Sequence, residues 1–201
     1  MKLIISAVED VIVDSVVNNS YIKSKPEKIK AEEILKLVKE RTNGTMQGVD
    51  TIFLNMGPGS FTGIRASMAL VVGLVAGKKI NIIPFTSFDA LEYDKLTADK
   101  VLAVNGFSNF VYVSYLKAKK QVHECIEIDK LKTLSKNKTI LSSSDKILDF
   151  ASQNQIKNQK VEFNLENVVK KHENKILNKI AFEPVYLRLS QAELQRKEKQ
   201  K

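Results

Sequence analysis

The residues best suited to chemistry in this 201-residue chain form a glycine-rich loop, GPGSFTGIRAS, which runs from Gly57 to Ser67. Gly57 and Gly59 tolerate positive φ, so they allow a strand to turn sharply into a helix. Ser60 can cap that helix, and the N–H groups exposed at its start form a possible anion site. A tight turn with close packing accounts for the same residues without a ligand, so both interpretations stay open.

Three catalytic motifs contain a similar loop, and each requires a feature that is missing here. A phosphate-binding Walker A loop needs lysine after its last glycine, but Ile64 follows Gly63. A dinucleotide fingerprint has the spacing G-x-G-x-x-G, and this loop is one residue longer. A nucleophile elbow has glycine two residues away on both sides of its serine, whereas Ser60 lies between Pro58 and Thr62. The loop therefore indicates none of these enzyme classes.

Metal and cofactor sites have little support elsewhere in the chain. The two histidines, His123 and His172, form neither an H-x-x-x-H nor an H-E-x-x-H pattern. His123 and Cys125 could share a strand face, and Asp10 with Asp14 could coordinate Mg²⁺, but acids at a hairpin tip are usually solvated. We therefore expect no metal and no cofactor.

Composition indicates a globular protein of the cytoplasm. Apolar residues make up 43% of the chain and charged residues 27%, which is typical of a folded domain. The single cysteine, Cys125, excludes an internal disulfide and suits a reducing compartment. The longest apolar run, Met68–Gly77, is about half a membrane span, and Glu9 interrupts the apolar start too early for a signal peptide. We expect no membrane segment.

Hydrophobic periodicity around the loop predicts an α/β fold in two units. Strands are expected at residues 2–7, 11–17, 21–24, 50–55, 79–85, 101–104, 110–116, 122–128 and 185–189. Helices are expected at residues 24–42, 61–76, 86–96 and 142–150, the first beginning with a capping box at Ser24. We expect residues 1–98 to form an N-terminal lobe, residues 99–183 a smaller second lobe, and residues 184–201 a C-terminal strand and basic tail.

The helix after the loop carries small residues at Gly63, Ser67, Gly73 and Gly77, which fall near one face. A glycine inside a helix costs about 1 kcal/mol relative to alanine. Such positions indicate that another helix or a strand approaches the helix backbone closely.

Four segments carry a family resemblance. They read KAEEIL at 30–35, GPGSFTGIRAS at 57–67, PFTSFDAL at 84–91 and YLRLSQAE at 186–193. These segments resemble the TsaB (YeaZ) family, bacterial proteins of tRNA threonylcarbamoyladenosine biosynthesis. The resemblance covers most of residues 1–116 and 184–196, while residues 117–183 are not recognisable.

This resemblance implies a two-lobe actin-like ATPase fold of ribonuclease-H-like topology, with the second lobe shortened. It implies a non-catalytic scaffold subunit, not an enzyme, which supports a catalytic TsaD subunit. That subunit transfers threonylcarbamoyl to N6 of adenosine 37 in tRNAs reading ANN codons, and a TsaE ATPase joins the complex. tRNA would be contacted indirectly or weakly, and the free protein could form a homodimer.

The resemblance also assigns residues to sites, none of them catalytic. The partner-binding candidates on the N-terminal-lobe helices are Glu32, Leu35, Gly63, Ser67, Leu70, Gly73 and Leu74. The signature loop consists of Gly57, Pro58, Gly59, Ser60, Phe61, Thr62, Gly63, Ile64 and Arg65. The C-terminal motif contains Tyr186, Arg188, Gln191 and Glu193.

Three positions depart from the family pattern and lose polar groups suited to a nucleotide. Ala7 replaces the aspartate of the first turn, Lys30 replaces a histidine, and Asn105-Gly106-Phe107 replaces the acidic turn of the second lobe. The alternative function is an actin-like nucleotide-binding ATPase or a glycoprotease-like enzyme, and these departures argue against it.

The net charge of +9 is unevenly distributed. Residues 1–100 hold 13 basic and 12 acidic residues, whereas residues 101–201 hold 19 and 11. A basic second lobe fits either a nucleic-acid contact or a lysine-rich solubilising surface. Direct tRNA contact through Lys117, Lys119 and Lys120 is therefore a further hypothesis.

Overall fold

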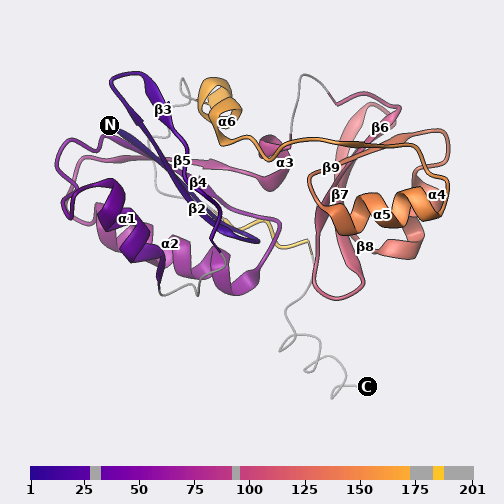
Figure 1. Ribbon diagram of the computed structural model, residues 1–201, viewed down its shortest axis with the longest axis horizontal. Helices are drawn as coiled ribbons and strands as arrows, with labels where there is room; N and C mark the ends of the chain where they lie inside the picture. The colour runs from indigo at the N-terminus through magenta and orange to yellow at the C-terminus, as the bar shows by residue number, and fades with distance from the viewer. Residues whose placement is uncertain (28–32, 92–95, 173–182, 188–201) are drawn as a thin grey trace, which may run out of the picture.

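The chain folds into two lobes, each built around a five-stranded β-sheet, which lie side by side along the long axis of the molecule (Figure 1). This computed structural model describes residues 1–27, 33–91, 96–172 and 183–187. Among these residues, no helix is both long enough and apolar enough to span a membrane.

The first sheet has the strand order β3-β2-β1-β4-β5. Its strands are β1 (Lys2–Ala7), β2 (Val11–Val17), β3 (Ser20–Ile22), β4 (Thr51–Asn55) and β5 (Asn81–Phe85). β1 pairs antiparallel with β2 and parallel with β4, so it lies at the centre of the sheet. Every residue of β4 is buried, as expected for a parallel strand covered on both faces.

Helices cover both faces of the first sheet. α1 (Ile34–Arg41) and α2 (Phe61–Val75) pack on the face that carries Leu3, and α6 (Leu165–His172) packs on the face that carries Ile4. Successive strand residues point to opposite faces, so neighbours in sequence enter different cores. Figure 1 shows α1 and α2 on one side of the sheet and α6 on the other.

The second sheet, in the order β10-β9-β6-β7-β8, repeats the topology of the first. Its strands are β6 (Lys100–Asn105), β7 (Phe110–Lys117), β8 (Lys120–Glu127), β9 (Thr139–Ser142) and β10 (Asn158–Lys160). In both lobes the central strand has two strands on each side. The two on one side pair antiparallel (β2 and β3, β7 and β8), and the two on the other side pair parallel (β4 and β5, β9 and β10). This agrees with the two-lobe architecture that the family resemblance implies.

The second lobe is smaller because its helical segments are short, while its sheet is complete. They are the 3₁₀ turn η2 (Ile128–Lys130), α4 (Leu131–Leu134) and α5 (Asp145–Gln153). The four residues of α4 contrast with the fifteen of α2 in the first lobe. Residues 117–183, which carry no recognisable family motif, therefore still supply three of the five strands of this sheet, β8, β9 and β10.

The predicted boundary of the second lobe needs a correction. Residues 99–183 were expected to belong to it, but α6 packs on the first sheet, where Val168 joins Ile4 and Phe53 in one core. The chain crosses back between the lobes just before α6, and Asn164 N donates to Ala90 O at 2.8 Å. An amphipathic helix shows which of its faces is apolar but not which sheet it covers.

The helix start predicted at Ser24 is wrong. α1 begins at Ile34, and Glu27, the expected partner in the capping box, instead forms an isolated β-bridge with Val11. The side chain of Ser24 is engaged by Asp14, which outcompetes a local cap because the carboxylate is buried and charged.

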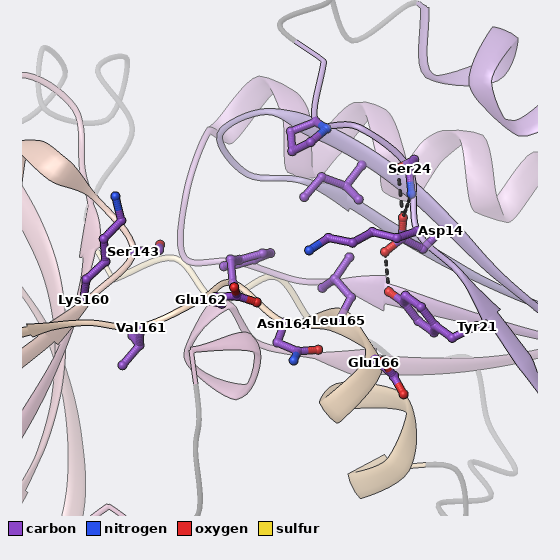
Figure 2. Close-up of a pocket in the computed structure, with 14 residues that line it drawn as sticks. Asp14, Tyr21, Ser24, Ser143, Lys160, Val161, Glu162, Asn164, Leu165 and Glu166 are labelled. Carbon is purple, nitrogen blue, oxygen red and sulfur yellow. Dashed lines mark hydrogen bonds between the residues drawn. The ribbon is translucent and has the colours of Figure 1, made fainter.

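Asp14 is buried in β2 and accepts hydrogen bonds from three donors (Figure 2). Ser24 donates from its N at 2.6 Å and from its Oγ at 2.9 Å, and the Tyr21 hydroxyl donates to the other carboxylate oxygen. Burial, followed by the neighbouring Asp14 carboxylate, raises the pKa of Tyr21 far above its usual value. Asp14 is therefore a polar anchor between β2 and the strand that follows it, not the solvated acid expected from the sequence.

The short helix α3 (Ser87–Ala90) begins at a capping box, as the Thr86-Ser87 pair predicts. Asp89 N donates to Thr86 Oγ1 at 3.2 Å, and Thr86 N donates to Asp89 Oδ2 at 2.8 Å. Lys171 of α6 lies 3.3 Å from Asp89 Oδ1. Burial raises the pKa of Asp89, but the hydrogen bonds from Thr86 and the charges of Lys171 and His172 outweigh it and hold this pKa below its ordinary value.

Replacing Asp89 by asparagine is expected to lower the free energy of unfolding by about 1 kcal/mol at about pH 7. The folded-state pKa of Asp89 lies below the unfolded-state value, so the carboxylate stabilises the fold above the unfolded pKa. This contribution disappears as the pH falls through the folded-state pKa. Urea titrations of wild type and D89N at several pH values from about 7 to about 3 measure the difference, and a difference independent of pH would contradict this role.

Candidate functional site

The signature loop between β4 and α2 is held in place by buried hydrogen bonds around Asn55. Asn55 Oδ1 accepts from Gly57 N at 2.9 Å, and Asn55 Nδ2 donates to Ser6 Oγ at 3.1 Å. Ser87 N donates to Gly57 O at 2.9 Å, and Ser87 Oγ donates to Pro58 O at 2.8 Å. These hydrogen bonds attach the loop to both β1 and α3. They hold its backbone in one conformation even though Gly57 and Gly59 are the most flexible type of residue.

Two glycines at the start of α2 lie against the end of β1 at distances that leave no space for a side chain. A Cβ on Gly63 would lie 1.8 Å from Ala7 O, and a Cβ on Gly59 would lie 2.4 Å from Val8 Cβ. Ser60 Oγ accepts from Gly63 N at 3.2 Å, which confirms the predicted helix cap. Of the two open interpretations, the structure supports close packing, because the carbonyl of Ala7 already lies against the first turn of α2.

The C-terminal motif returns to the signature loop. Tyr186 stacks on Phe61 with 4.6 Å between ring centroids and 9° between ring planes. The Arg65 guanidinium lies 5.6 Å from the Phe61 centroid and 5.5 Å from the Tyr186 centroid, and Arg65 Nε donates to Tyr186 Oη at 3.1 Å. No local signal in the sequence joins these two motifs, because Arg65 and Tyr186 lie 121 residues apart. Arg188, Gln191 and Glu193 lie outside the described residues.

A cleft of about 490 Å³ between the lobes begins beside this stack. Its walls come from Val8 and Glu9 after β1, from the first turn of α2, and from residues 105–107 at the end of β6 and in the turn that follows it. Glu9 and Arg65 are the charged residues of the lining, and Arg65 is already engaged by two aromatic rings. Within the part of the chain that the structure describes, no group of three or more His, Cys, Asp or Glu could hold a metal ion.

Two of the predicted partner-binding residues lie inside the first lobe. Gly63 packs on Ala7, and Ser67 is buried with its Oγ donating to Ile64 O at 3.0 Å. Their assignment to a partner surface is therefore wrong. The predicted close approach does occur at Gly63, but the neighbour is β1 of the same chain.

The remaining partner-binding candidates lie at or near the surface. Leu70 and Leu74 are half-buried and pack against the core of the first lobe, while Gly73 is exposed and a Cβ there would meet nothing within 4 Å. Leu35 of α1 is 36% exposed. Glu32 lies outside the described residues.

The outer face of α2 is exposed and uncharged. Val72, which is not among the predicted partner-binding residues, is 49% exposed, and Ala69 and Ala76 lie on the surface near it. No charged residue occurs from Ala66 to Gly77, although a helix with one face in water ordinarily carries charges there. The absence of charges along this run was the available signal for Val72.

Two lobes with the same strand order, arranged around a cleft, form the two-lobe actin-like fold of ribonuclease-H-like topology. A family model described as "TsaD: tRNA N6-adenosine threonylcarbamoyltransferase" matches residues 18–193. The chain belongs to this family. The match and the structural neighbours together support the YeaZ (TsaB) assignment made from the sequence motifs.

Two solved structures from Pseudomonas aeruginosa are similar to this chain. One, described as an uncharacterized protein with similarity to peptidase YEAZ, has a TM-score of 0.64 at 15% identity and covers 93% of this chain and 99% of its own. The other, YeaZ, has a TM-score of 0.63 at 16% identity and covers 92% and 98%. At these identities the likeness shows the fold alone. No curated protein matches the sequence.

Proposed function

We propose that this chain is a non-catalytic scaffold subunit for the formation of threonylcarbamoyladenosine in tRNA in the cytoplasm. It binds a TsaD-like catalytic subunit, which transfers threonylcarbamoyl to N6 of adenosine 37 in tRNAs reading ANN codons. A TsaE-like ATPase joins the pair. The observation that carries this proposal is the exposed, uncharged face of α2 in a chain that belongs to a tRNA-modifying family.

The face on α1 and α2 has the features of a protein-binding surface. Val72 and Leu35 supply exposed apolar area, and Gly73 has open space around it, so a partner backbone could approach α2 closely. Contiguous apolar surface is uncommon on soluble monomers and marks interaction sites. A second copy of this chain is the competing occupant, and the experiments below separate the two.

The residues in and behind the cleft support the non-catalytic part of the proposal. In an actin-like nucleotide site the turns after the first strand of each lobe approach the phosphates. Here Ala7 O lies against Gly63, and Arg65 is engaged by Phe61 and Tyr186. Among the described residues that line the cleft, Arg65 is the one basic residue, and these contacts already engage it, which argues against independent ATP turnover.

The test is reconstitution with the TsaD-like protein of the same genome. We expect the two chains to co-elute in size exclusion. We also expect threonylcarbamoyladenosine, measured by mass spectrometry of tRNA nucleosides, only when both chains and an activated threonylcarbamoyl donor are present. Modification by the TsaD-like protein alone at the same rate would contradict the scaffold role, and ATP hydrolysis by the isolated chain would favour the enzyme alternative.

A further inference from the structure

The β7–β8 hairpin of the second lobe ends in a turn that goes against local preferences. Ala118 and Lys119 occupy its two central positions with φ of 49° and 65°, a region that favours glycine and asparagine. Lys117 and Lys120 lie directly opposite each other on the two strands, and like charges in that arrangement are destabilising. Neither choice of residue helps the turn to form.

The first lobe contains the same turn with favourable residues. Its β2–β3 hairpin occupies the equivalent place in the strand order and turns through Asn18 and Asn19, with φ of 50° and 63°. The flanking pair, Val17 and Ser20, is uncharged. Because the two backbones have nearly the same conformation, the lysines of the second hairpin are not required by its geometry. Local rules broken at one place and kept at its equivalent indicate a functional site.

The lysines at this tip are available to a ligand. Within the described ranges, no hydrogen bond or ion pair engages the ammonium groups of Lys117, Lys119 or Lys120. Lys138 lies 4.9 Å from the ring centroid of Tyr115. Side chains two residues apart on a strand share a face, so Lys138 lies over the face of β7 that also carries Lys117.

A groove of about 510 Å³ continues from the tip towards α6. Lys119, His123 and Lys171 are among its lining residues, together with Asp89. The Asp89 carboxylate is already engaged by Thr86 and by Lys171, so it does not oppose an anion with a free negative charge. Because this ion pair also engages Lys171, Lys119 supplies the positive charge of the groove, and His123 adds a group that can donate a hydrogen bond to a phosphate oxygen.

Charge is concentrated in this lobe as a whole. Residues 99–160 carry eleven lysines and six acidic residues, whereas residues 1–98 carry twelve basic and eleven acidic residues. A clustered lysine excess on one lobe is the electrostatic footprint of a polyanion-binding surface.

We propose that the tip of the β7–β8 hairpin and the groove beside it bind the phosphate backbone of RNA, and specifically of the tRNA substrate if the proposed function holds. A narrow projecting turn with lysines on both of its faces suits a backbone whose phosphates lie along a line. A lipid surface fits less well, because the turn Lys117-Ala118-Lys119-Lys120 offers no large apolar side chain for insertion.

The test compares full-length chains for tRNA binding by fluorescence anisotropy in a salt series starting at low ionic strength. The variant carries Lys117→Gln, Lys119→Asn and Lys120→Ser, which removes three charges and installs residues favourable to the turn. We expect at least about a tenfold loss of affinity at low salt, and a salt slope reduced by about two to three. We expect its resistance to urea to be equal or higher, so unfolding does not explain the loss.

Two controls separate the tip from overall charge and from turn structure. The variant Lys130→Gln, Lys136→Gln, Lys157→Gln removes the same charge from exposed positions elsewhere in the lobe and is expected to lose less than about threefold. Ala118→Asn keeps every lysine and should bind like wild type. Equal losses in both triple variants, no tRNA binding by wild type, or equally tight tip-dependent binding to vesicles of anionic phospholipid would overturn the proposal. Association with the TsaD-like protein is measured separately, so failure of the scaffold role is recognised independently.

Discussion

Alanine at position 63 is expected to destabilise the first lobe severely, by about 3 kcal/mol or more, or to prevent it from folding. A Cβ on Gly63 would lie 1.8 Å from Ala7 O, which is a backbone atom, and the Cβ itself is fixed by the backbone of α2. The collision cannot be relieved by rotating a side chain, so α2 would have to move away from β1. That movement would also break the Ser60 cap and weaken the core that Val71 and Val75 fill.

The matched control is Gly73→Ala in the same helix. A Cβ at Gly73 meets nothing within 4 Å, so alanine there should raise the free energy of unfolding by about 0.5 to 1 kcal/mol through helix propensity alone. Urea denaturation followed by circular dichroism measures both variants. Similar midpoints for Gly63→Ala and wild type would show that β1 and α2 are not packed as described. Gly63 variants are consequently unsuitable for testing partner binding, because the fold itself depends on this glycine.

Replacing Val72 by lysine is expected to weaken the affinity for the TsaD-like subunit by about 100-fold or more and to leave the fold intact. Val72 is 49% exposed, so a charge there is solvated in the free protein. In a complex that covers α2, the same charge would be buried without a partner, which costs several kcal/mol. Isothermal titration of the purified subunits measures the affinity, and circular dichroism verifies the fold.

Ile22→Lys provides the comparison for a charge added at an exposed apolar residue. Ile22 lies on the edge strand β3, outside the proposed face, and is 41% exposed. The affinity of the Ile22→Lys variant for the TsaD-like subunit should therefore remain near the wild-type value. Val72→Glu distinguishes burial from charge attraction, since both signs of charge should weaken a buried apolar contact. Unchanged affinity in both Val72 variants would remove α2 from the interface. Loss of a homodimer without loss of the heterodimer would assign this face to self-association instead.

The unit from β4 to β5 could be predicted well because its signals are local. A buried apolar strand, a glycine-rich turn, a serine cap and a long apolar helix follow one another within 36 residues, Asp50–Phe85. The Ser60 cap and the Thr86 cap occur as predicted. The cap predicted at Ser24 failed because a residue distant in sequence, Asp14, binds the same side chain more strongly.

The candidate site shows the same contrast between local sequence signals and contacts that only the folded chain makes. The close neighbour predicted for the small residues of α2 occurs at Gly63, where it is β1, but not at Gly73, where a Cβ would meet nothing within 4 Å. Only the tertiary structure distinguishes the two positions. The stacking of Tyr186 on Phe61 and the packing of α6 on the first sheet are likewise seen only in the tertiary structure.

By itself, then, the sequence determined the family and the elements with strong local signals, but it did not predict β9, β10 or α6. The chain's path through space determined which surfaces are covered and which remain exposed on α2 and at the β7–β8 tip. The physical reason is that caps, turns and periodicity depend on interactions between residues a few positions apart. Burial depends on contacts between segments far apart in sequence, and the same local pattern is compatible with many of these.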